Sequence, residues 1–153
     1  MKVLLQRVNL ASVEVDNKVV GKIGKGLLAF LGVGKEDSEV EVTTLVEKLI
    51  NLRIFPVEDP STSSGQGKHF DKSLLEVGGE VLVVSQFTLY ANCEKGRRPD
   101  FFDSADPKKA EDLYNKFIDK LKSKNIKTEA GKFGAYMQVN LENDGPCTFW
   151  LER

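Results

Sequence analysis

The sequence predicts an α+β protein with a mostly antiparallel, barrel-like β-sheet and two covering helices. Short runs of β-branched and aliphatic residues fill the first 33 residues and recur after residue 80, as strands of one sheet would. Two longer segments place apolar residues at helical spacing. The chain has 153 residues and neither repeats nor a linker, so we expect a single domain spanning residues 1–153.

The first 33 residues predict a meander of short strands. Four segments are rich in β-branched and aliphatic residues, and turns at Asp16–Lys18 and Gly24–Gly26 precede the last two of them. These segments are Val3–Leu10, Ser12–Asp16, Val19–Ile23 and Leu27–Val33. The fourth is nearly all apolar, so we expect it to be buried on both faces.

The first helix is predicted at about residues 38–51. Ser38 and Glu41 have the spacing of a capping box, in which each side chain can bind the other residue's free amide. Five apolar residues then recur at helical spacing and make one face. They are Val42, Leu45, Val46, Leu49 and Ile50. After this helix, Arg53–Pro56 is predicted as a short strand and the polar segment Pro60–Lys68 as a loop.

The second half of the chain predicts more strands and one more helix. Leu74–Val77 and Glu80–Tyr90 are expected to be strands joined at Gly78-Gly79, a hairpin signal. Asp106-Pro107 offers an N-cap followed by proline, and apolar residues at helical spacing carry this helix over about 107–123. Three terminal strands complete the sheet. They are Ile126–Glu129, Phe133–Glu142 and Cys147–Leu151.

Composition argues against several classes of function. Hydrophobic residues make up 41% and charged residues 29%, as in ordinary globular proteins, and no apolar run is long enough to span a bilayer. The N-terminal segment MKVLLQRVNL lacks a signal-peptide pattern, so we expect an intracellular, cytoplasmic protein. The net charge is −1, so a nucleic acid would have to bind at local clusters such as Lys95–Arg98 or Lys120–Lys124.

The chain offers little for metal- or histidine-dependent chemistry. It has two cysteines, Cys93 and Cys147, and one histidine, His69. A structural zinc ion normally takes four Cys or His ligands, more than one chain supplies here. A single histidine beside a Ser/Gly loop gives poor support to a Ser-His-Asp or Cys-His mechanism. We therefore expect neither a metal nor another cofactor.

A polar segment at the end of an apolar strand is the best local candidate for chemistry. In VSQFTLY, the polar residues Ser85, Gln86 and Thr88 follow the apolar run Val81–Val84. If the strand bends here, the backbone N–H groups of Phe87 and Thr88 lose their strand partners. Together with the Gln86 amide, they could hold a developing oxyanion. The residues alone leave open the alternative of polar positions without function.

Seven ordered segments carry a resemblance to a known family. They are Gln6-Arg7-Val8, Gly26–Val33, Leu52–Phe55, Ser85–Tyr90, Lys95–Pro99, Phe133–Met137 and Asn143–Thr148. Together they cover essentially the whole chain, which resembles the D-aminoacyl-tRNA deacylase family in its bacterial and eukaryotic form. The SQFTL and Gly-Pro-x-Thr segments are the family's signature. Two features depart from the family pattern: Cys147 replaces the usual Val, and the Pro60–Phe70 loop is longer.

The resemblance implies hydrolysis of the ester that joins a D-amino acid to the 3′-terminal adenosine of tRNA, and cleavage of glycyl-tRNA as well. It implies tRNA as a partner, no cofactor, and a homodimer with active sites at the subunit interface. Gly145-Pro146 then corresponds to a cis turn that enters the partner's pocket. There its main-chain carbonyls would exclude the side chain of an L-substrate.

The resemblance also assigns roles to single residues. Ser85, Gln86, Phe87 and Thr88 correspond to the catalytic floor, whose amides hold the ester carbonyl. The remaining residues correspond to positions near the Gly-Pro turn or the terminal adenosine. Arg7 lies near the turn, and Phe133, Met137 and Ala110 lie around the adenosine.

Two questions stay open from the sequence. Thr88 could be a nucleophile, but no base is evident to activate its hydroxyl, so we favour water activated with help from the adenosine 2′-OH. The rival functions are a paralogous deacylase that accepts L-alanyl-tRNA through a trans Gly-Pro bond and a non-catalytic RNA-binding factor on the same fold. The paralogue's pattern begins with Pro-Gln, whereas this chain has Ser85-Gln86.

Overall fold

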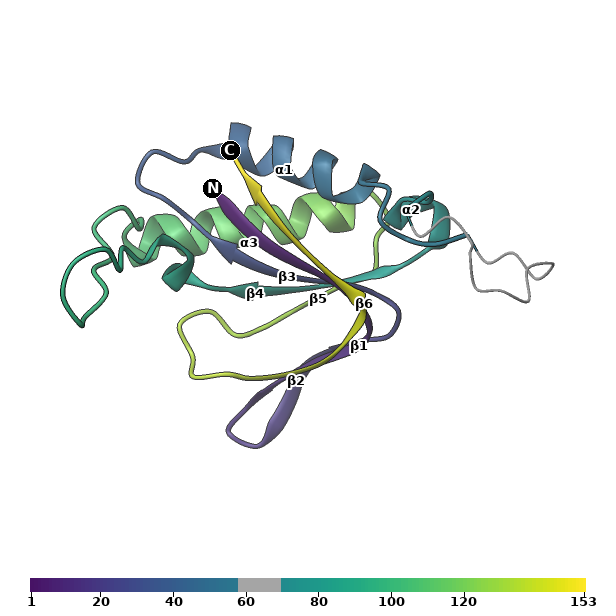
Figure 1. Cartoon of the computed structure of the whole chain (residues 1–153), viewed down its shortest axis with the longest axis horizontal. Helices are drawn as coiled ribbons and strands as arrows, with labels where there is room; N and C mark the ends of the chain where they lie inside the picture. Colours follow the sequence, from purple (N-terminus) through teal and green to yellow (C-terminus); the bar gives the residue numbers. More distant parts are fainter. Residues whose placement is uncertain (58–69) are drawn as a thin grey trace.

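The computed structural model describes residues 1–57 and 70–153. Within these ranges, six strands form one curled sheet, and two helices, α1 (Glu39–Asn51) and α3 (Pro107–Ser123), lie side by side over one face (Figure 1). The predicted α+β class with two covering helices is confirmed. None of the described helices is long and apolar enough to cross a membrane. The predicted loop Pro60–Lys68, and His69, lie outside the described residues.

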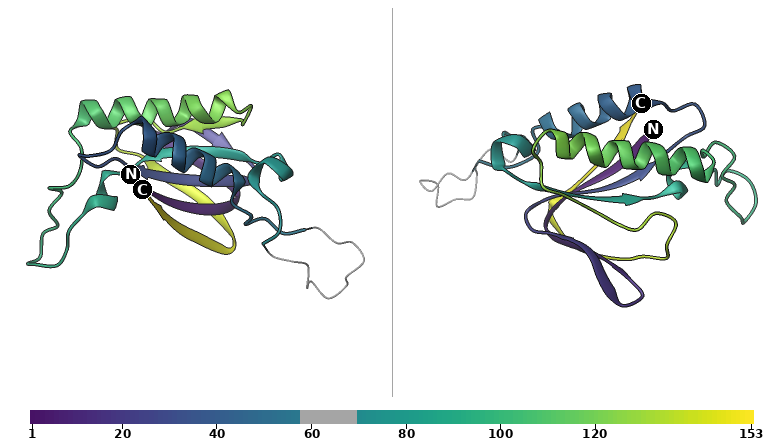
Figure 2. Two further views of the ribbon diagram at one scale, coloured as in Figure 1. Left: turned by 90° about the horizontal axis from the view of Figure 1, so that it is seen from above. Right: turned by 180° about the vertical axis from the view of Figure 1, so that it is seen from behind.

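The first strand, β1 (Lys2–Val15), organises the sheet. Its first half pairs antiparallel with β3 (Gly26–Gly32), and its second half pairs antiparallel with β2 (Lys18–Ile23). Along its other edge it pairs antiparallel with β6 (Gln138–Glu152). Because β1 changes partner midway, the sheet curls into an open, barrel-like shape, which Figure 2 shows from two sides.

The rest of the sheet is parallel. β4 (Glu80–Ser85) lies between β3 and β5 (Thr128–Ala130) and runs parallel to both. Three of the five pairings are therefore antiparallel and two are parallel. The parallel part lies directly beneath α1 and α3, as expected for strands that are buried on both faces.

Both covering helices begin at the predicted caps. The Ser38 side chain accepts a hydrogen bond from the Val40 amide, and Glu41 closes the capping box. Asp106 caps α3, which starts at Pro107. All five residues of the predicted apolar face of α1 are buried. The predicted bounds of the two helices, 38–51 and 107–123, are therefore confirmed.

Two hydrophobic clusters hold the curled sheet together. The larger lies between the sheet and the two helices and includes Phe55 and Phe117, both fully buried. The smaller is formed by residues of β1, β2, β3 and β4. Its members are Val8, Ala11, Val13, Ile23, Leu28, Leu82 and Val84. Met137 and Val139 pack against the smaller cluster and thereby position the segment that leads into β6.

The strand predicted at Leu74–Val77 is wrong: these residues form the short helix α2. Ser73 and Glu76 make a second capping box, and Gly78 ends the helix with φ at 61°. The two glycines therefore end a helical turn rather than join a hairpin. A short, mostly apolar segment fits a strand or a helix, and the Ser-x-x-Glu spacing of a capping box is the sequence signal that favours the helix.

Several other strands differ in extent from their predictions. The predicted strand Glu80–Tyr90 stops at Ser85 and is followed by a 3₁₀ helix, η1 (Phe87–Tyr90). The strands predicted at Phe133–Glu142 and Cys147–Leu151 are parts of one strand, β6, which begins only at Gln138 and runs through the Gly-Pro segment. Likewise, β1 is one strand rather than two. At Arg53–Pro56 the structure has a single bridge, from Phe55 to Lys72.

Candidate active site

The chain turns at Gln86, where β4 gives way to η1. The Gln86 amide still donates to the Leu31 carbonyl at 2.8 Å, and Leu89 then donates to the Gln86 carbonyl at 3.3 Å. The N–H groups of Phe87 and Thr88 lie between these two bonds, at the start of the helix. The first N–H groups of a helix have no acceptor within it. The structure therefore has the bend on which the oxyanion interpretation depends.

The hydroxyl of Thr88 lies beside an amide rather than a base. Gln86 donates its side-chain N–H to the Thr88 Oγ1. An amide N–H cannot take up a proton, so this contact orients the hydroxyl without activating it. Within residues 1–57 and 70–153, no three His, Cys, Asp or Glu side chains gather as metal ligands would.

Two glycines at the end of β3 allow η1 to pack closely. A Cβ on Gly32 would lie 3.1 Å from the Gln86 carbonyl oxygen and 3.1 Å from the Leu89 Cβ. A Cβ on Gly34 would lie 2.6 Å from the hydroxyl oxygen of Tyr90. Side chains at these two positions would therefore push η1 away from the sheet. In the sequence, Gly32-Val33-Gly34 is the local signal of this close approach.

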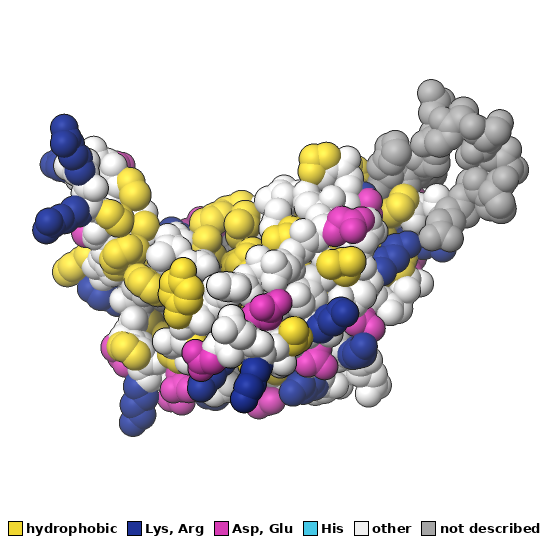
Figure 3. All heavy atoms as spheres, turned by 90° about the horizontal axis from the view of Figure 1, so that it is seen from below, with side chains coloured by type: hydrophobic (Ala, Val, Ile, Leu, Met, Phe, Trp, Pro, Cys, Tyr) yellow, Lys and Arg dark blue, Asp and Glu magenta, His cyan; other side chains and the backbone are white. Residues whose placement is uncertain are grey.

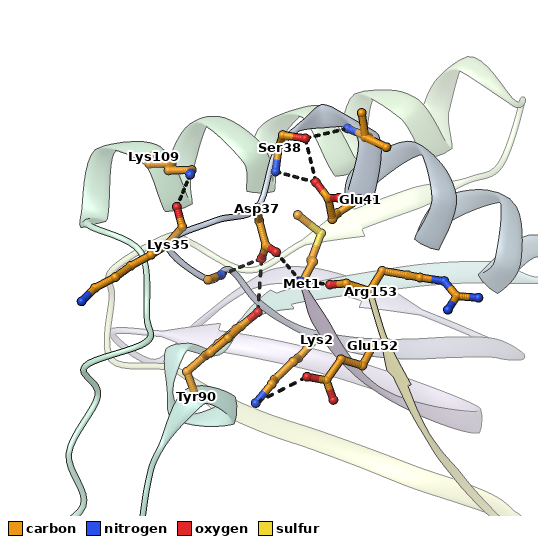
Figure 4. A network of polar contacts seen from close by, with 12 residues as sticks. Met1, Lys2, Lys35, Asp37, Ser38, Glu41, Tyr90, Lys109, Glu152 and Arg153 are labelled. Carbon is orange, nitrogen blue, oxygen red and sulfur yellow. Dashed lines mark hydrogen bonds and ion pairs between the residues drawn. The ribbon is translucent and has the colours of Figure 1, made fainter.

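Asp37 links Tyr90, the last residue of η1, to Gly34 and to the N-terminus through hydrogen bonds and an ion pair (Figure 4). Its carboxylate accepts hydrogen bonds from the Tyr90 hydroxyl at 3.2 Å and the Gly34 amide at 2.6 Å, and it pairs with the Met1 amino group at 2.5 Å. Burial and the neighbouring Asp37 carboxylate raise the pKa of Tyr90 above its ordinary value of 10.0. The hydroxyl thus stays protonated and remains a donor to Asp37.

A cavity of about 490 Å³ opens beside η1, a volume typical of small-molecule sites. Six of the ten predicted site residues line it, whereas Thr88 is adjacent but does not line it. The six are Ser85, Gln86, Phe87, Ala110, Phe133 and Met137. They come from the end of β4, the start of α3 and the segment before β6, so three separate parts of the chain meet here.

Tyr114 supports the rear of this cavity, a role that the sequence did not indicate. Its hydroxyl is within hydrogen-bond distance of the Val83 carbonyl at 2.9 Å and the Gly131 carbonyl at 3.1 Å. Its ring lies 5.7 Å from that of Phe133, centroid to centroid. Burial raises the pKa of Tyr114 to about 12, so the hydroxyl remains a donor. From the sequence, this residue was only one of several apolar positions on the helix.

The other predicted residues form a second cluster around the Gly-Pro segment. Arg7, only 4% exposed, pairs through Nε with Asp144 at 2.8 Å and donates to the Ile54 carbonyl at 2.5 Å. Asn143 donates to the carbonyls of Arg7 at 2.9 Å and Cys147 at 3.1 Å. The Gly145-Pro146 peptide bond is cis, and both residues are exposed.

The two clusters lie apart within one chain. Arg7 pairs with Leu27 at the start of β3, whereas Leu31 and Val33, at the other end of that strand, line the cavity. At about 3.3 Å per residue, four to six residues of strand separate them by roughly 13–20 Å. Neither Gly145 nor Pro146 lines the cavity of its own chain.

Residues 4–152 match the family model described as D-Tyr-tRNA(Tyr) deacylase. A D-aminoacyl-tRNA deacylase from Thermosipho melanesiensis is 52% identical over 153 residues, which cover 99% of this chain and 97% of that protein. One from Aquifex aeolicus is 51% identical over 152 residues, with the same coverage.

Two solved structures are similar in fold. A structure named c-Myc DNA unwinding element binding protein is 41% identical, with a TM-score of 0.89, and the match covers 100% of this chain and 99% of the other. A probable eukaryotic D-amino acid tRNA deacylase is 19% identical, with a TM-score of 0.83 over 98% of this chain and 97% of its own.

Proposed function

Because this chain belongs to the D-Tyr-tRNA(Tyr) deacylase family and is a D-aminoacyl-tRNA deacylase, we propose that the cavity beside η1 is where it hydrolyses its substrate. The bond cleaved is the ester between a D-amino acid and the 3′-terminal adenosine of tRNA. Since tRNA is charged in the cytoplasm, we place the enzyme there. The bend at Gln86, where η1 begins and Phe87 lines the cavity, is the observation that supports this proposal.

The reaction requires a water molecule, an oxyanion site and a leaving ribose oxygen. The N–H groups of Phe87 and Thr88 hold the ester carbonyl oxygen as negative charge develops on it. Water adds to the carbonyl carbon, the bond to the ribose 3′-oxygen breaks, and the water proton passes to that oxygen by way of the neighbouring 2′-OH. The products are the free amino acid and tRNA. Thr88 orients the site through its contact with Gln86.

The walls of the cavity suit a nucleoside. Phe133 and Met137 offer an aromatic ring and a polarisable thioether to an adenine base, and Ala110 leaves room beside them. Tyr114 holds this wall against β4 through its hydroxyl. The wall is mostly apolar, which suits the flat face of a base.

Selection between D- and L-substrates is proposed to come from the partner chain. Gly145 and Pro146 are exposed and do not line their own cavity, so in a two-fold dimer each turn could enter the other subunit's cavity. Its main-chain carbonyls would then exclude the side chain of an L-substrate. A glycyl ester has no side chain to exclude, so it would also be cleaved. Arg7 holds the turn through Asp144.

The decisive experiment compares D-tyrosyl-tRNA, L-tyrosyl-tRNA, glycyl-tRNA and L-alanyl-tRNA as substrates, with the molar mass measured by light scattering. We expect a dimer that cleaves the D-tyrosyl and glycyl esters and spares both L-esters. Faster cleavage of L-alanyl-tRNA would identify the paralogous deacylase instead. Binding of tRNA without any hydrolysis would identify a non-catalytic factor, and an active monomer would contradict the shared site.

A further inference from the structure

A projecting loop next to the cavity is firmly anchored at its base (Figure 2). Asn92 and Asp100 exchange two backbone hydrogen bonds, at 2.9 and 3.0 Å. The Asn92 side chain also accepts from the Glu94 amide at 3.0 Å, and the Asp100 side chain accepts from the Phe102 amide at 3.2 Å. These four bonds fix the direction in which the loop leaves the body.

The tip of this loop concentrates positive charge. Lys95, Arg97 and Arg98 are exposed, and Glu94 is the one acidic residue between Asn92 and Asp100. The ion pairs found among the described residues do not include these three cations. The chain as a whole carries a net charge of −1, so this cluster is a local exception. Figure 3 shows Lys and Arg side chains gathered at the projecting end of the molecule.

The second basic cluster of the chain is different. At the end of α3, Lys124 pairs with Glu47 at 2.5 Å, which ties it to α1. The charge of Lys124 is therefore used within the fold, whereas the ion pairs found among the described residues include neither Lys120 nor Lys122. The three loop cations are exposed and lie in one short loop beside the cavity.

Both ends of the loop are fixed to the cavity wall. On one side the chain comes directly from η1, whose Phe87 lines the cavity and packs edge-on against Phe101 with ring centroids 4.9 Å apart. On the other side, Ser104 lines the cavity and forms a bridge to Gly34. The base of the loop therefore lies at the cavity wall, and the loop that carries the cations projects from there.

The rim also carries exposed aromatic rings. Phe87 and Tyr136, which line the cavity, are 58% and 90% exposed. A combination of cations with exposed aromatic rings is typical of surfaces that bind single-stranded nucleic acid, because bases stack on the rings while cations contact the phosphates. A free anion would need only the cations. The rim thus favours a polynucleotide.

We propose that Lys95, Arg97 and Arg98 bind the phosphates of the single-stranded 3′ end of tRNA, on the 5′ side of the terminal adenosine. This inference rests on the proposed function, in which that adenosine occupies the cavity. A cavity of about 490 Å³ takes one nucleoside with its amino acid, so the preceding nucleotides must leave across the rim. The loop contacts the RNA backbone at the point where the RNA leaves the cavity.

The test compares two substrates of the purified protein. One is D-tyrosyl-tRNA, and the other is 3′-O-D-tyrosyl-adenosine, which has the ester and the base but no phosphate. The Lys95→Ala/Arg97→Ala/Arg98→Ala variant should raise KM for the tRNA substrate about tenfold. It should also lower the slope of log(kcat/KM) against log salt by about 2, since each single-strand phosphate contact contributes about 0.7. Hydrolysis of the adenosine ester should stay within about twofold of wild type.

A matched control removes three positive charges elsewhere. Lys18→Ala/Lys22→Ala/Lys122→Ala changes exposed residues of β2 and the end of α3 and should leave the salt slope almost unchanged. The proposal is overturned if the control matches the loop variant, if the loop variant keeps the wild-type slope, or if both substrates lose activity equally.

Binding of uncharged tRNA, followed by fluorescence anisotropy, separates this inference from the proposed function. If wild type cleaves neither ester, the proposed function fails. In that case, a weaker, less salt-dependent binding of uncharged tRNA by the loop variant would still support the phosphate subsite. Equal binding by wild type and the loop variant would overturn it.

Discussion

Replacing Gly34 by Ala is expected to displace Tyr90 and, with it, the 3₁₀ helix that carries the two proposed oxyanion donors. The new Cβ would lie 2.6 Å from the Tyr90 hydroxyl oxygen and 2.8 Å from ring atoms Cε1 and Cζ. Ordinary contacts of a Cβ begin at 3.4 Å. The ring or the strand end must therefore move by about 0.8 Å, the difference between 3.4 and 2.6 Å.

The ring has little freedom to move away. Lys2 places its ammonium 4.4 Å from the ring centroid, and the hydroxyl is bound to Asp37. Overpacking of this kind costs about 1–3 kcal/mol, which lowers Tm by about 2–4 °C per kcal/mol in a protein of this size. Misplacement of catalytic groups by about 1 Å can cost about 10²-fold, so we expect kcat/KM to fall by about 10- to 100-fold.

The assay pairs thermal unfolding with D-tyrosyl-tRNA hydrolysis in four variants: Gly34→Ala, Gly24→Ala, Tyr90→Leu and the double variant Tyr90→Leu/Gly34→Ala. Gly24→Ala is the control, since its Cβ would meet nothing within 4 Å, and it should stay within about 0.5 kcal/mol of wild type. In a Tyr90→Leu background, the penalty of Gly34→Ala should shrink, because the atoms that it strikes are gone. An equal penalty in that background, or full activity of Gly34→Ala, would refute the reasoning.

Three further changes test other parts of the structure. Asp37→Asn leaves the buried Met1 amino group without its charged partner and should lower the free energy of unfolding by about 3–5 kcal/mol, measured with urea; a loss below about 1 kcal/mol would contradict this. Thr88→Ala should keep kcat within about tenfold, whereas complete inactivity together with a trapped acyl-threonine would make Thr88 the nucleophile. Hydrogen bonds from Ser38 lower the pKa of Glu41 below 4.5. The ionised Glu41 carboxylate therefore stabilises the folded protein fully above pH 4.5, and this stabilisation is lost as the pH falls through the lowered pKa. The Tm difference between wild type and Glu41→Gln should therefore shrink at acidic pH, and a difference that stays constant would argue against it.

Elements with strong local signals were predictable from the sequence. The helices α1 and α3 each combine a cap with several turns of apolar spacing, so two independent local patterns agree. The helix α2 has only four residues, and its apolar run also fits a strand. The end of β4 was missed because Phe87 and Leu89 continue a strand-like alternation, while packing against Gly32 and Gly34 decides the local structure.

The candidate site was predictable only in part, because it depends on contacts between residues that are far apart in the sequence. Polar residues after a buried strand pointed to Ser85 and Gln86 without any knowledge of their neighbours. Asp37 and Tyr90 are 53 positions apart, and only the folded chain brings their side chains together. The close approach of Tyr114 to two main-chain carbonyls likewise depends on how α3 packs on the sheet.

The pairing of β1 with β6 has a consequence for how the protein is made. Of the described strands, β1 is synthesised first and β6 last, yet they pair along most of their lengths. Contacts so distant in sequence carry the largest loop-closure cost and form late. Until then, one edge of β1 is open to pairing with other chains. The contact of Arg7 with the turn at Asp144 also waits for β6. The sheet that carries the candidate active site is therefore completed only after translation of the chain has reached β6.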